Sequence, residues 1–378
     1  MQASPLMQLQ LVVTGAHLSP EFGLTYREIE GDGFHIDSRV EMLLSSDSPV
    51  GTAKSMALCL SGVADALSTL RPDIVVLLGD RFEMLPVAAA ALILRIPVAH
   101  LHGGESTEGA FDDSIRHAIT KLSHLHFVAH DEYRQRVIQM GEAPERVHTV
   151  GGLGVDAIHR IRLLDRRSLE EALEFPLGHR NLLVTFHPAT LESESAATQV
   201  SELLSALADL ADTHLVFTLP NADTDSRAIV ERINQFVAQH PTNARVYASL
   251  GQIRYFSCLR HFDAVVGNSS SGLAEAPTFK IATVNIGTRQ AGRLRSTSVI
   301  DCAPTRSSIH DALARAFSAE FQELLKSAVN PYGTGGASDA IVRVLETWPL
   351  EGLVNKKFYD LPVPSSGTTT IRTERGAT

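Results

Sequence analysis

The residues between Pro97 and His126 carry a dense group of titratable side chains. They combine imidazoles, carboxylates and a guanidinium: His100, His102, Glu105, Asp112, Asp113, Arg116, His117 and His124. Taken singly, each could be a helix cap, part of a solvated helix face or a half-buried histidine. Taken as a set beside the Gly103-Gly104 turn, groups of both charges are suited to proton transfer. The stretch therefore predicts a site of acid–base chemistry.

A short strand, a turn and a helix must position this set. The alternation in 97–102 predicts a strand with His100 and His102 on one side and Leu101 on the other. From Asp112 onward, apolar residues recur at three-to-four spacing, which predicts an amphipathic helix with Asp112 as its N-cap. The opposite, polar face of that helix is expected to hold Asp113, Arg116, His117, Thr120 and His124.

Strands and helices alternate through the first half of the chain. Apolar runs predict strands over 9–15, 73–79 and 126–130, and helical patterns cover 55–70, 85–95 and 132–140. This alternation predicts a doubly wound parallel sheet, whose ligands bind at the carboxyl ends of the strands. Residues that follow strands are therefore expected at one crevice: His17, Asp80, Arg81, His102 and Glu105. Asp80 and Arg81 could equally form a surface ion pair of little energetic value.

A second α/β series follows the segment 151–161. Its expected strands are 181–188, 213–221, 244–249, 262–268 and 281–287, and a further helix is expected over 338–348. We predict two Rossmann-like lobes with a cleft between them, and no internal repeat of solenoid period. The expected division is 1–155 for the first lobe, 156–337 for the second, 338–362 for a helix returning to the first lobe, and 363–378 for a disordered polar tail.

A serine-rich turn in the second lobe could bind phosphate. Residues 267–272, GNSSSG, follow a strand and lead into a helical pattern, so helix N–H groups would be free to bind an anion there. The same turn is also an ordinary helix start. His187, Asn221 and Arg289 end strands on the same expected edge, and Glu275 could accept from ribose hydroxyls. These residues together predict a pocket for a nucleoside diphosphate.

Several classes of function are disfavoured by motif and composition. The chain has no G-x-G-x-x-G after a strand and no complete Walker motif, so dinucleotide redox chemistry and ATP hydrolysis are not expected. The net charge of −10, without any Lys/Arg cluster, argues against nucleic-acid binding. No apolar run reaches membrane-spanning length and no leader pattern is present. Cys59, Cys258 and Cys302 are expected as free thiols in the cytoplasm.

Several motifs together resemble one known family. They are GDRFE (79–83), HLHGGE (100–105), DDSIRHAITKLSHLHF (112–127), the His187-Pro188 strand end, GNSSSG (267–272) and NIGTRQ (285–290). These motifs are similar to those of the hydrolysing UDP-N-acetylglucosamine 2-epimerases that open sialic-acid-type sugar pathways. The resemblance covers nearly the whole chain and implies a GT-B fold with UDP held mainly by the second lobe.

The resemblance also implies a reaction without a cofactor or a metal. UDP would leave a UDP-sugar while a carboxylate takes the C2 proton, and water would add to the resulting glycal to give N-acetylmannosamine or an analogue. By motif, the catalytic candidates are Asp80, Asp112, Glu105 and His102. The candidates for holding UDP are His187, Ser269, Ser270, Glu275 and Arg289, with Arg81 and Asn221 as further nucleotide contacts. His17 and Arg116 are candidates for the sugar side.

The chain departs from the family pattern at two places. Position 102 is histidine where sialic-acid-pathway members carry a glutamate, and HGGESTEGAF is more similar to the branch that acts on UDP-N,N'-diacetylbacillosamine for legionaminic acid. The family also starts with a strand, a G-T-R-A-[DE]-Y-G loop and a helix, which this sequence lacks at its start. We therefore expect an N-terminally shortened first lobe, and a chain that folds poorly or is inactive as written.

Three alternatives are left open by the residues. A GT-B glycosyltransferase would share the UDP pocket but pass the sugar to an acceptor. A hydrolase could use His100 and His102 with Asp112, Asp113 and His117 as metal ligands. A binding protein would hold the nucleotide sugar without consuming it. In each reading the partner is a small molecule rather than a nucleic acid or membrane, and a homo-oligomer, dimer or tetramer, is expected.

Overall fold

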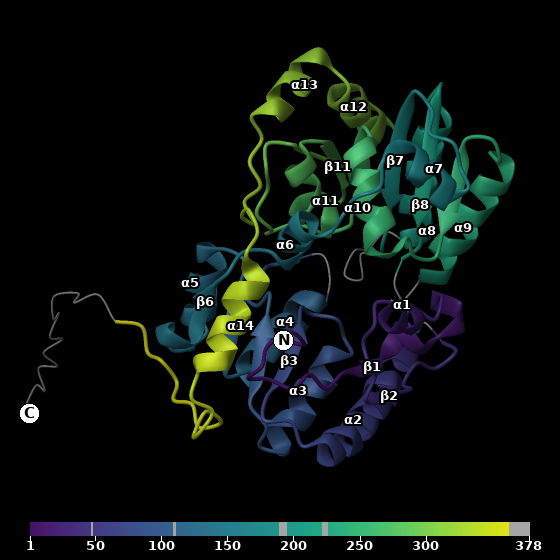
Figure 1. Ribbon diagram of the computed structural model, residues 1–378. Coiled ribbons are helices and arrows are strands. Elements are labelled where there is room, and N and C mark those ends of the chain that lie inside the picture. The colour runs from purple at the N-terminus through teal and green to yellow at the C-terminus, as the bar shows by residue number, and fades with distance from the viewer. Residues whose placement is uncertain (47, 109–110, 189–194, 221–225, 363–378) are drawn as a thin grey trace, which may run out of the picture.

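The computed structural model describes residues 1–46, 48–108, 111–188, 195–220 and 226–362. These residues form two α/β lobes, the first in purple and blue and the second in teal and green, stacked one above the other in Figure 1. All strand pairs are parallel, and helices flank the sheets. The predicted class, two α/β lobes built on parallel sheets, is confirmed.

The first lobe contains a four-stranded sheet and a separate two-stranded one. The larger sheet has the order β3-β4-β5-β6 and comprises β3 (Val75–Leu78), β4 (Val98–Leu101), β5 (Leu125–Val128) and β6 (Val147–Thr149). Every residue of β4 and β5 is buried, as expected for parallel strands covered on both faces. The smaller sheet pairs β1 (Val12–Thr14) with β2 (Ser38–Val40).

Two sequence predictions in this lobe are corrected at element ends. The strand expected over 9–15 is only the three residues of β1, because the Leu11 amide donates to the Asp37 carboxylate instead of to a strand. The helix expected over 55–70 begins earlier, because Ser48 caps it and Pro49 occupies its first position. The lobe's helices are α1 (Tyr26–Gly31), α2 (Pro49–Leu70), α3 (Met84–Ile93), α4 (Asp112–Leu122) and α5 (Asp131–Gln139), with turns η1 (Gly15–Leu18), η2 (Pro20–Phe22) and η3 (Pro144–Arg146).

The sheet of the second lobe has the order β12-β11-β10-β7-β8-β9. Its strands are β7 (Arg180–Thr185), β8 (Thr213–Thr218), β9 (Ala244–Tyr247), β10 (Ala264–Gly267), β11 (Ala282–Ile286) and β12 (Val299–Cys302). The chain builds outward from β7 in one direction and from β10 in the other, so the strand order reverses between these two neighbours. Ligands of doubly wound sheets bind at such a switch point, beyond the carboxyl ends of the strands.

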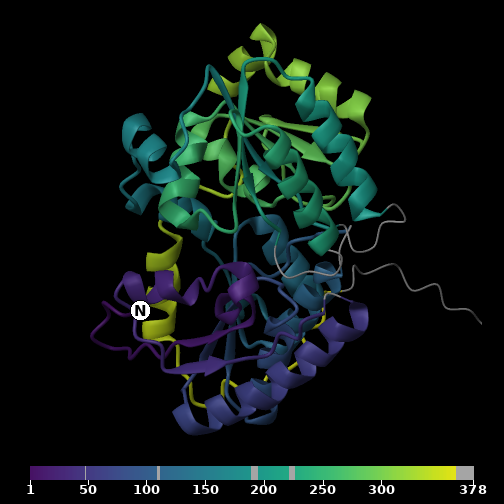
Figure 2. The same cartoon turned by 90° about the vertical axis from the view of Figure 1, so that its right-hand side faces the viewer.

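Helices complete the second lobe and return the chain to the first. They are α7 (Arg166–Leu173), α8 (Ala196–Ala208), α9 (Ser226–Gln239), α10 (Gly251–His261), α11 (Ser271–Ala274), η4 (Ala276–Phe279), α12 (Arg306–Ala316) and α13 (Ala319–Lys326). Helix α6 (Leu153–Arg160) connects the lobes, and α14 (Ala337–Thr347), in yellow, lies against the first lobe in both views (Figures 1 and 2). Ile341 and Leu345 of α14 pack there with Leu101 and Phe127.

The expected tail, 363–378, lies outside the described residues. In the described part of the chain, every helix is too short or too polar to cross a membrane.

Candidate functional site

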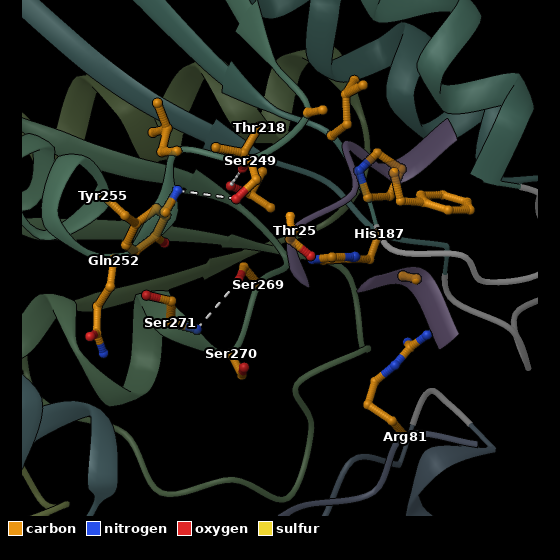
Figure 3. Close-up of a pocket in the computed structure, with 18 of the residues that line it drawn as sticks. Thr25, Arg81, His187, Thr218, Ser249, Gln252, Tyr255, Ser269, Ser270 and Ser271 are labelled. Carbon is orange, nitrogen blue, oxygen red and sulfur yellow. Dashed lines mark hydrogen bonds between the residues drawn. The ribbon is translucent and has the colours of Figure 1, made fainter. Parts of the chain in front are cut away.

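A cavity of about 780 Å³ lies between the two lobes. A pocket of this size can enclose a ligand as large as a nucleotide sugar. The first lobe contributes polar residues that include His17, Thr25, Glu28, Asp32, Asp80, Arg81, Glu83, Thr107 and Asp112. The second lobe contributes Thr185, His187, Thr218, Ser249, Gln252, Tyr255, Ser269, Ser270, Ser271, Glu275, Arg289 and Arg293. Figure 3 shows Arg81 on the opposite side of the pocket from the three consecutive serines, Ser269, Ser270 and Ser271.

Two carboxylates of the first lobe line this cavity. Asp80 follows β3, and its side chain is 20% exposed and forms an ion pair with Arg116. Asp112 is the first residue of α4 and is buried, with Oδ2 4.0 Å from Nη2 of Arg289 in the second lobe. The predicted N-cap role of Asp112 is wrong, since Phe111 occupies that position. The Asp112 carboxylate still lies in the first turn, where the helix dipole favours negative charge.

The second lobe presents a rigid turn at its switch point. Gly267 ends β10 with φ of 134°, and a Cβ atom there would lie 1.9 Å from the Thr185 carbonyl oxygen, so only glycine fits. The next residue, Asn268, accepts from the His187 amide at 2.7 Å and donates to the His187 carbonyl at 2.8 Å. This pair of hydrogen bonds fixes His187, at the end of β7, beside the serine turn.

The serine turn leads into a shorter helix than its sequence suggests. Ser269 and Ser270 line the cavity, but α11 has only four residues before the chain enters η4. Free N–H and hydroxyl groups, rather than a long helix dipole, are therefore the donors that this turn offers to an anion. Glu275 follows the helix, lines the cavity and packs closely against Gly154 of α6. Burial raises the pKa of Glu275.

Polar residues of the first lobe face the same space. His17 lies in η1, and its Nδ1 is 2.7 Å from Oγ1 of Thr25 on the approach to α1. Arg81 extends over the ring of Phe82. His17 and Arg81 both line the cavity, where residues that follow strands were expected. Asn221, predicted as a nucleotide contact, lies outside the described residues.

Three predicted residues lie behind the cavity wall rather than in it. Arg116 is only 1% exposed; it donates to the Glu105 carbonyl at 2.9 Å and pairs with Asp80. The Glu105 carboxylate is 2.7 Å from His102 Nδ1, and its other oxygen is 3.2 Å from Nη1 of Arg293. Burial alone would raise the pKa of Glu105, but Arg293 and the hydrogen bond from His102 hold it at about 2.

The two strand histidines do not converge. His100 is fully buried, with Nε2 2.8 Å from the Gly79 carbonyl and Nδ1 3.2 Å from the Thr120 hydroxyl. His102 lies beyond the end of β4 in a left-handed conformation, φ 62°, and its Nε2 accepts from the Leu153 amide at 3.2 Å. Among the described residues, no three His, Cys, Asp or Glu side chains come together as a metal-binding group. The histidines instead serve the hydrogen-bond network around β4.

Several residues that line the cavity were not singled out from the sequence, and three of them, Glu83, Thr107 and Arg293, are charged or make contacts between the lobes. Glu83 lines the cavity, and one of its carboxylate oxygens is buried with no hydrogen-bond partner among the described residues. Thr107 and Arg293 also line it and contact each other across the lobes. Glu83 is the last residue of the GDRFE motif, and Arg293 comes three residues after the NIGTRQ motif. The position of Glu83 and Arg293 in or just after motifs that follow strands was the sequence signal that could have indicated them.

Comparison with known proteins identifies the family to which this architecture belongs. A family model described as UDP-N-acetylglucosamine 2-epimerase matches residues 1–346. The chain belongs to the UDP-N-acetylglucosamine 2-epimerase family. The resemblance inferred from the sequence motifs is thereby confirmed, and the protein is an enzyme of nucleotide-sugar chemistry.

Two curated relatives of this epimerase-family chain match over almost its full length. A GDP/UDP-N,N'-diacetylbacillosamine 2-epimerase (hydrolyzing) of Campylobacter jejuni is 42% identical, and the match covers 94% of this chain and 92% of the relative. Polysialic acid biosynthesis protein P7 of Escherichia coli is 37% identical, with 96% and 92% covered.

A solved structure has the same fold. The UDP-GlcNAc 2-epimerase of Neisseria meningitidis, bound to UDP-GlcNAc, superposes with a TM-score of 0.74 at 16% identity, covering 91% of this chain and 93% of that one. At this identity the likeness establishes the fold, which is the predicted GT-B arrangement of two lobes around a cleft.

Proposed function

We propose that this epimerase-family chain is a hydrolysing UDP-N-acetylglucosamine 2-epimerase. It converts UDP-N-acetylglucosamine and water into UDP and N-acetylmannosamine, as a step in nonulosonic (sialic-type) acid biosynthesis. One observation carries the proposal: Asp80 and Asp112 of the first lobe line the same cavity as Ser269, Ser270 and Arg289 of the second. Proton acceptors and diphosphate donors thus face one ligand from opposite sides.

The proposed reaction proceeds by elimination followed by hydration. The C2 hydrogen of the sugar becomes acidic only as the bond from C1 to the diphosphate oxygen breaks. The diphosphate leaves with that electron pair while Asp80 or Asp112 takes the C2 proton, which yields a glycal. Water then adds its oxygen to C1, and a proton returns to C2 from the other face. The stereocentre is inverted without oxidation, so no redox cofactor is required.

The remaining residues divide between binding and positioning. Arg289, His187 and the serine turn hold the diphosphate as negative charge develops on it, and Glu275 accepts from the ribose. Arg81 is a further nucleotide contact and His17 faces the sugar, while Asn221, also predicted for the nucleotide, lies outside the described residues. His102, Glu105 and Arg116, which lie behind the wall, act by fixing the catalytic carboxylates rather than by touching the sugar.

A second candidate substrate is UDP-N,N'-diacetylbacillosamine. The Campylobacter jejuni relative that is 42% identical carries this sugar in its name. The histidine at position 102, in place of the glutamate of the sialic-acid branch, also favours it. The chemistry would be unchanged, since the same C2 proton and the same diphosphate are involved.

One experiment separates these possibilities. Each UDP-sugar is incubated with the protein in heavy water, without an acceptor, and the products are followed by proton NMR. We expect free 2-epimeric sugar and UDP, with deuterium at C2, and the faster substrate is assigned as the natural one. A protium-only product would rule out elimination. Consumption of UDP-sugar only after an acceptor is added would favour a GT-B glycosyltransferase.

The domain boundaries, the oligomeric state and the compartment remain predictions. The boundary at 155/156 falls within α6 and that at 337/338 at the start of α14, so limited proteolysis would test them through cleavage in the adjoining loops, 161–165 and 327–336. A dimer or tetramer is consistent with exposed apolar side chains on α2 and near the end of α3: Leu58, Leu60, Leu92, Ile93 and Leu94. Light scattering after size-exclusion chromatography would measure the oligomeric state.

The three free cysteines fit a reducing cytoplasm.

A further inference from the structure

A loop of the second lobe, residues 289–294, packs on a loop of the first, residues 103–108. The Glu108 amide donates to the Ala291 carbonyl at 3.3 Å. Gly292, with φ of 80°, lies so close that a Cβ atom there would be 2.6 Å from Oγ of Ser106. The Leu294 amide donates to the Tyr133 hydroxyl at 3.1 Å. We call these two loops the interlobe clasp.

Arg293 makes the charged contact of the clasp. Its Nη1 lies 3.2 Å from Oε2 of Glu105, and its Nε and Nη2 lie 3.4 Å from the Thr107 hydroxyl. Both partners are on the first lobe and buried, and the Arg293 side chain is 10% exposed. A buried ion pair of this kind is strongly destabilised when one partner is removed, because the other charge is left uncompensated.

The first-lobe partners of Arg293 connect it to a catalytic candidate. Arg116 donates from Nη2 to the same Thr107 hydroxyl at 2.8 Å and from Nη1 to the Glu105 carbonyl at 2.9 Å. Arg116 also pairs with Asp80 at the cavity wall. A continuous line of contacts therefore runs from Arg293 through Glu105 and Thr107 to Arg116, and then to Asp80.

Both carboxylate oxygens of Glu105, at the centre of this line, have a partner. Glu105 binds His102 with one oxygen and Arg293 with the other. The Leu153 amide donates to Nε2 of His102, which leaves the proton on Nδ1 to bond Glu105. The pKa of Glu105, about 2, keeps the group ionised near neutral pH. Glu105 is thus suited to hold Arg293 rather than to accept a proton from a sugar.

We propose that Arg293 is a positioning residue for the epimerase reaction: it engages Glu105 and Thr107 across the lobes and thereby fixes Arg116 and Asp80 for proton transfer. The inference rests on the proposed function. Coupling the contact between lobes to the placement of Asp80 would restrict proton abstraction to the closed cavity. Misplacement of a catalytic group by about 1 Å can cost about 100-fold in rate.

The first test compares substitutions in one loop. Arg293→Gln should lower kcat by about 100-fold while the Kd for UDP changes less than about threefold. Arg293→Lys should retain part of the rate. Arg295→Gln is the matched control, because Arg295 directly follows the clasp loop but pairs with Asp301 and donates to the Gln290 carbonyl, both in the second lobe. It should behave as wild type. Adding Glu105→Gln to Arg293→Gln should cause no further loss, since the two residues act as one unit.

A second readout does not depend on catalysis. Hydrogen exchange of the backbone amides in 103–108 should be faster in Arg293→Gln than in Arg295→Gln or wild type, with UDP bound in all three. Equal kcat and equal exchange in the two variants would overturn the proposal. So would a large loss of UDP affinity with kcat unchanged, which would make Arg293 a diphosphate ligand. If wild type consumes neither UDP-sugar, the proposed function fails. Independently of that result, equal hydrogen exchange in 103–108 for Arg293→Gln and wild type would show that Arg293 does not hold the two loops together.

Discussion

Arg289 and Asp112 come from opposite lobes and meet across the cavity, with Nη2 4.0 Å from Oδ2. The arginine lies beside the serine turn, where it donates to the Asn268 carbonyl at 3.3 Å. Asp112 is the first residue of α4. A departing diphosphate and a proton acceptor would therefore be neighbours, which allows bond cleavage at C1 and deprotonation at C2 to be concerted.

Asp112→Asn should lose most of the activity and keep nucleotide binding. Loss of a general base typically costs about 10²- to 10⁴-fold in kcat, and the amide preserves the shape of the side chain. UDP release measures turnover, and calorimetry with UDP measures binding. Asp131→Asn is the control, because Asp131 is likewise the first residue of its helix, α5, but its carboxylate accepts from the Thr149 hydroxyl and does not line the cavity. Wild-type kcat in Asp112→Asn would remove this residue from the mechanism.

Asn268→Ala should weaken UDP binding by about tenfold. The side chain makes both hydrogen bonds that fix His187, and each is worth about 1 kcal/mol. Asn181→Ala is a matched control: Asn181 makes a similar pair of bonds to Gly178 at the other end of β7, far from the switch point. Both variants should lose stability, but only Asn268→Ala should raise the Kd for UDP. An equal Kd in the two would show that His187 does not bind the nucleotide.

The rule for strand ends explains what the sequence could predict. In a parallel sheet all carboxyl ends lie on one edge, so Asp80, His187 and Ser269 could be assigned to one crevice from their positions after apolar runs alone. The two-lobe fold followed from the same alternation. No side-chain geometry was needed for either inference.

The rule for strand ends could not place residues whose contacts are buried behind the cavity wall. Periodicity put Arg116 on a polar helix face, yet the side chain is buried, because its charge is met by Asp80 and by the Glu105 carbonyl. A hydrophobic pattern records polarity and not the partner that compensates it. Arg293 meets Glu105 from another lobe, and a contact between such distant segments leaves no trace in local spacing.

Acidification below neutrality should destabilise the fold through His100. The ring is completely buried, and burial lowers its pKa from 6.5 to about 3. Below pH 6.5 His100 binds a proton in the unfolded chain but not in the native state. The free energy of unfolding therefore decreases as the pH falls toward the native pKa of His100. From about pH 8 to about pH 5 this residue alone should cost about 2 kcal/mol. Urea unfolding at several pH values measures the loss.

His100→Gln should flatten this pH dependence by a similar amount. Glutamine keeps a donor for the Gly79 carbonyl but cannot be protonated, although the variant will be less stable at every pH. His35→Gln is the control, because the His35 side chain is 86% exposed and should leave the slope unchanged. The pKa values of His124 and His126 are also lowered by burial and act in the same direction, so some slope will remain. Parallel curves for wild type and His100→Gln would contradict the assignment.

The segment after α14 should be held on the first lobe by Lys356. Its Nζ donates to the carbonyls of Lys121 and Ser123, both at 2.7 Å, and lies 2.9 Å from Oε1 of Glu142. Glu142 is 1% exposed; burial alone would raise its pKa, but His126, Lys121 and Lys356 hold it at about 2. Removing the ammonium group leaves two carbonyls and part of a buried carboxylate without compensation.

Lys356→Ala should therefore lower the free energy of unfolding by about 2 to 4 kcal/mol, measured in urea. Lys121 still contacts Glu142, which keeps the loss below that of a fully orphaned charge. Lys357→Ala is the control, since the neighbouring Lys357 is exposed and should change stability by less than about 0.5 kcal/mol. Because Glu142 and Lys356 do not line the cavity, kcat of Lys356→Ala should match wild type wherever the protein remains folded. An unchanged unfolding midpoint would mean that this segment is not anchored through Lys356.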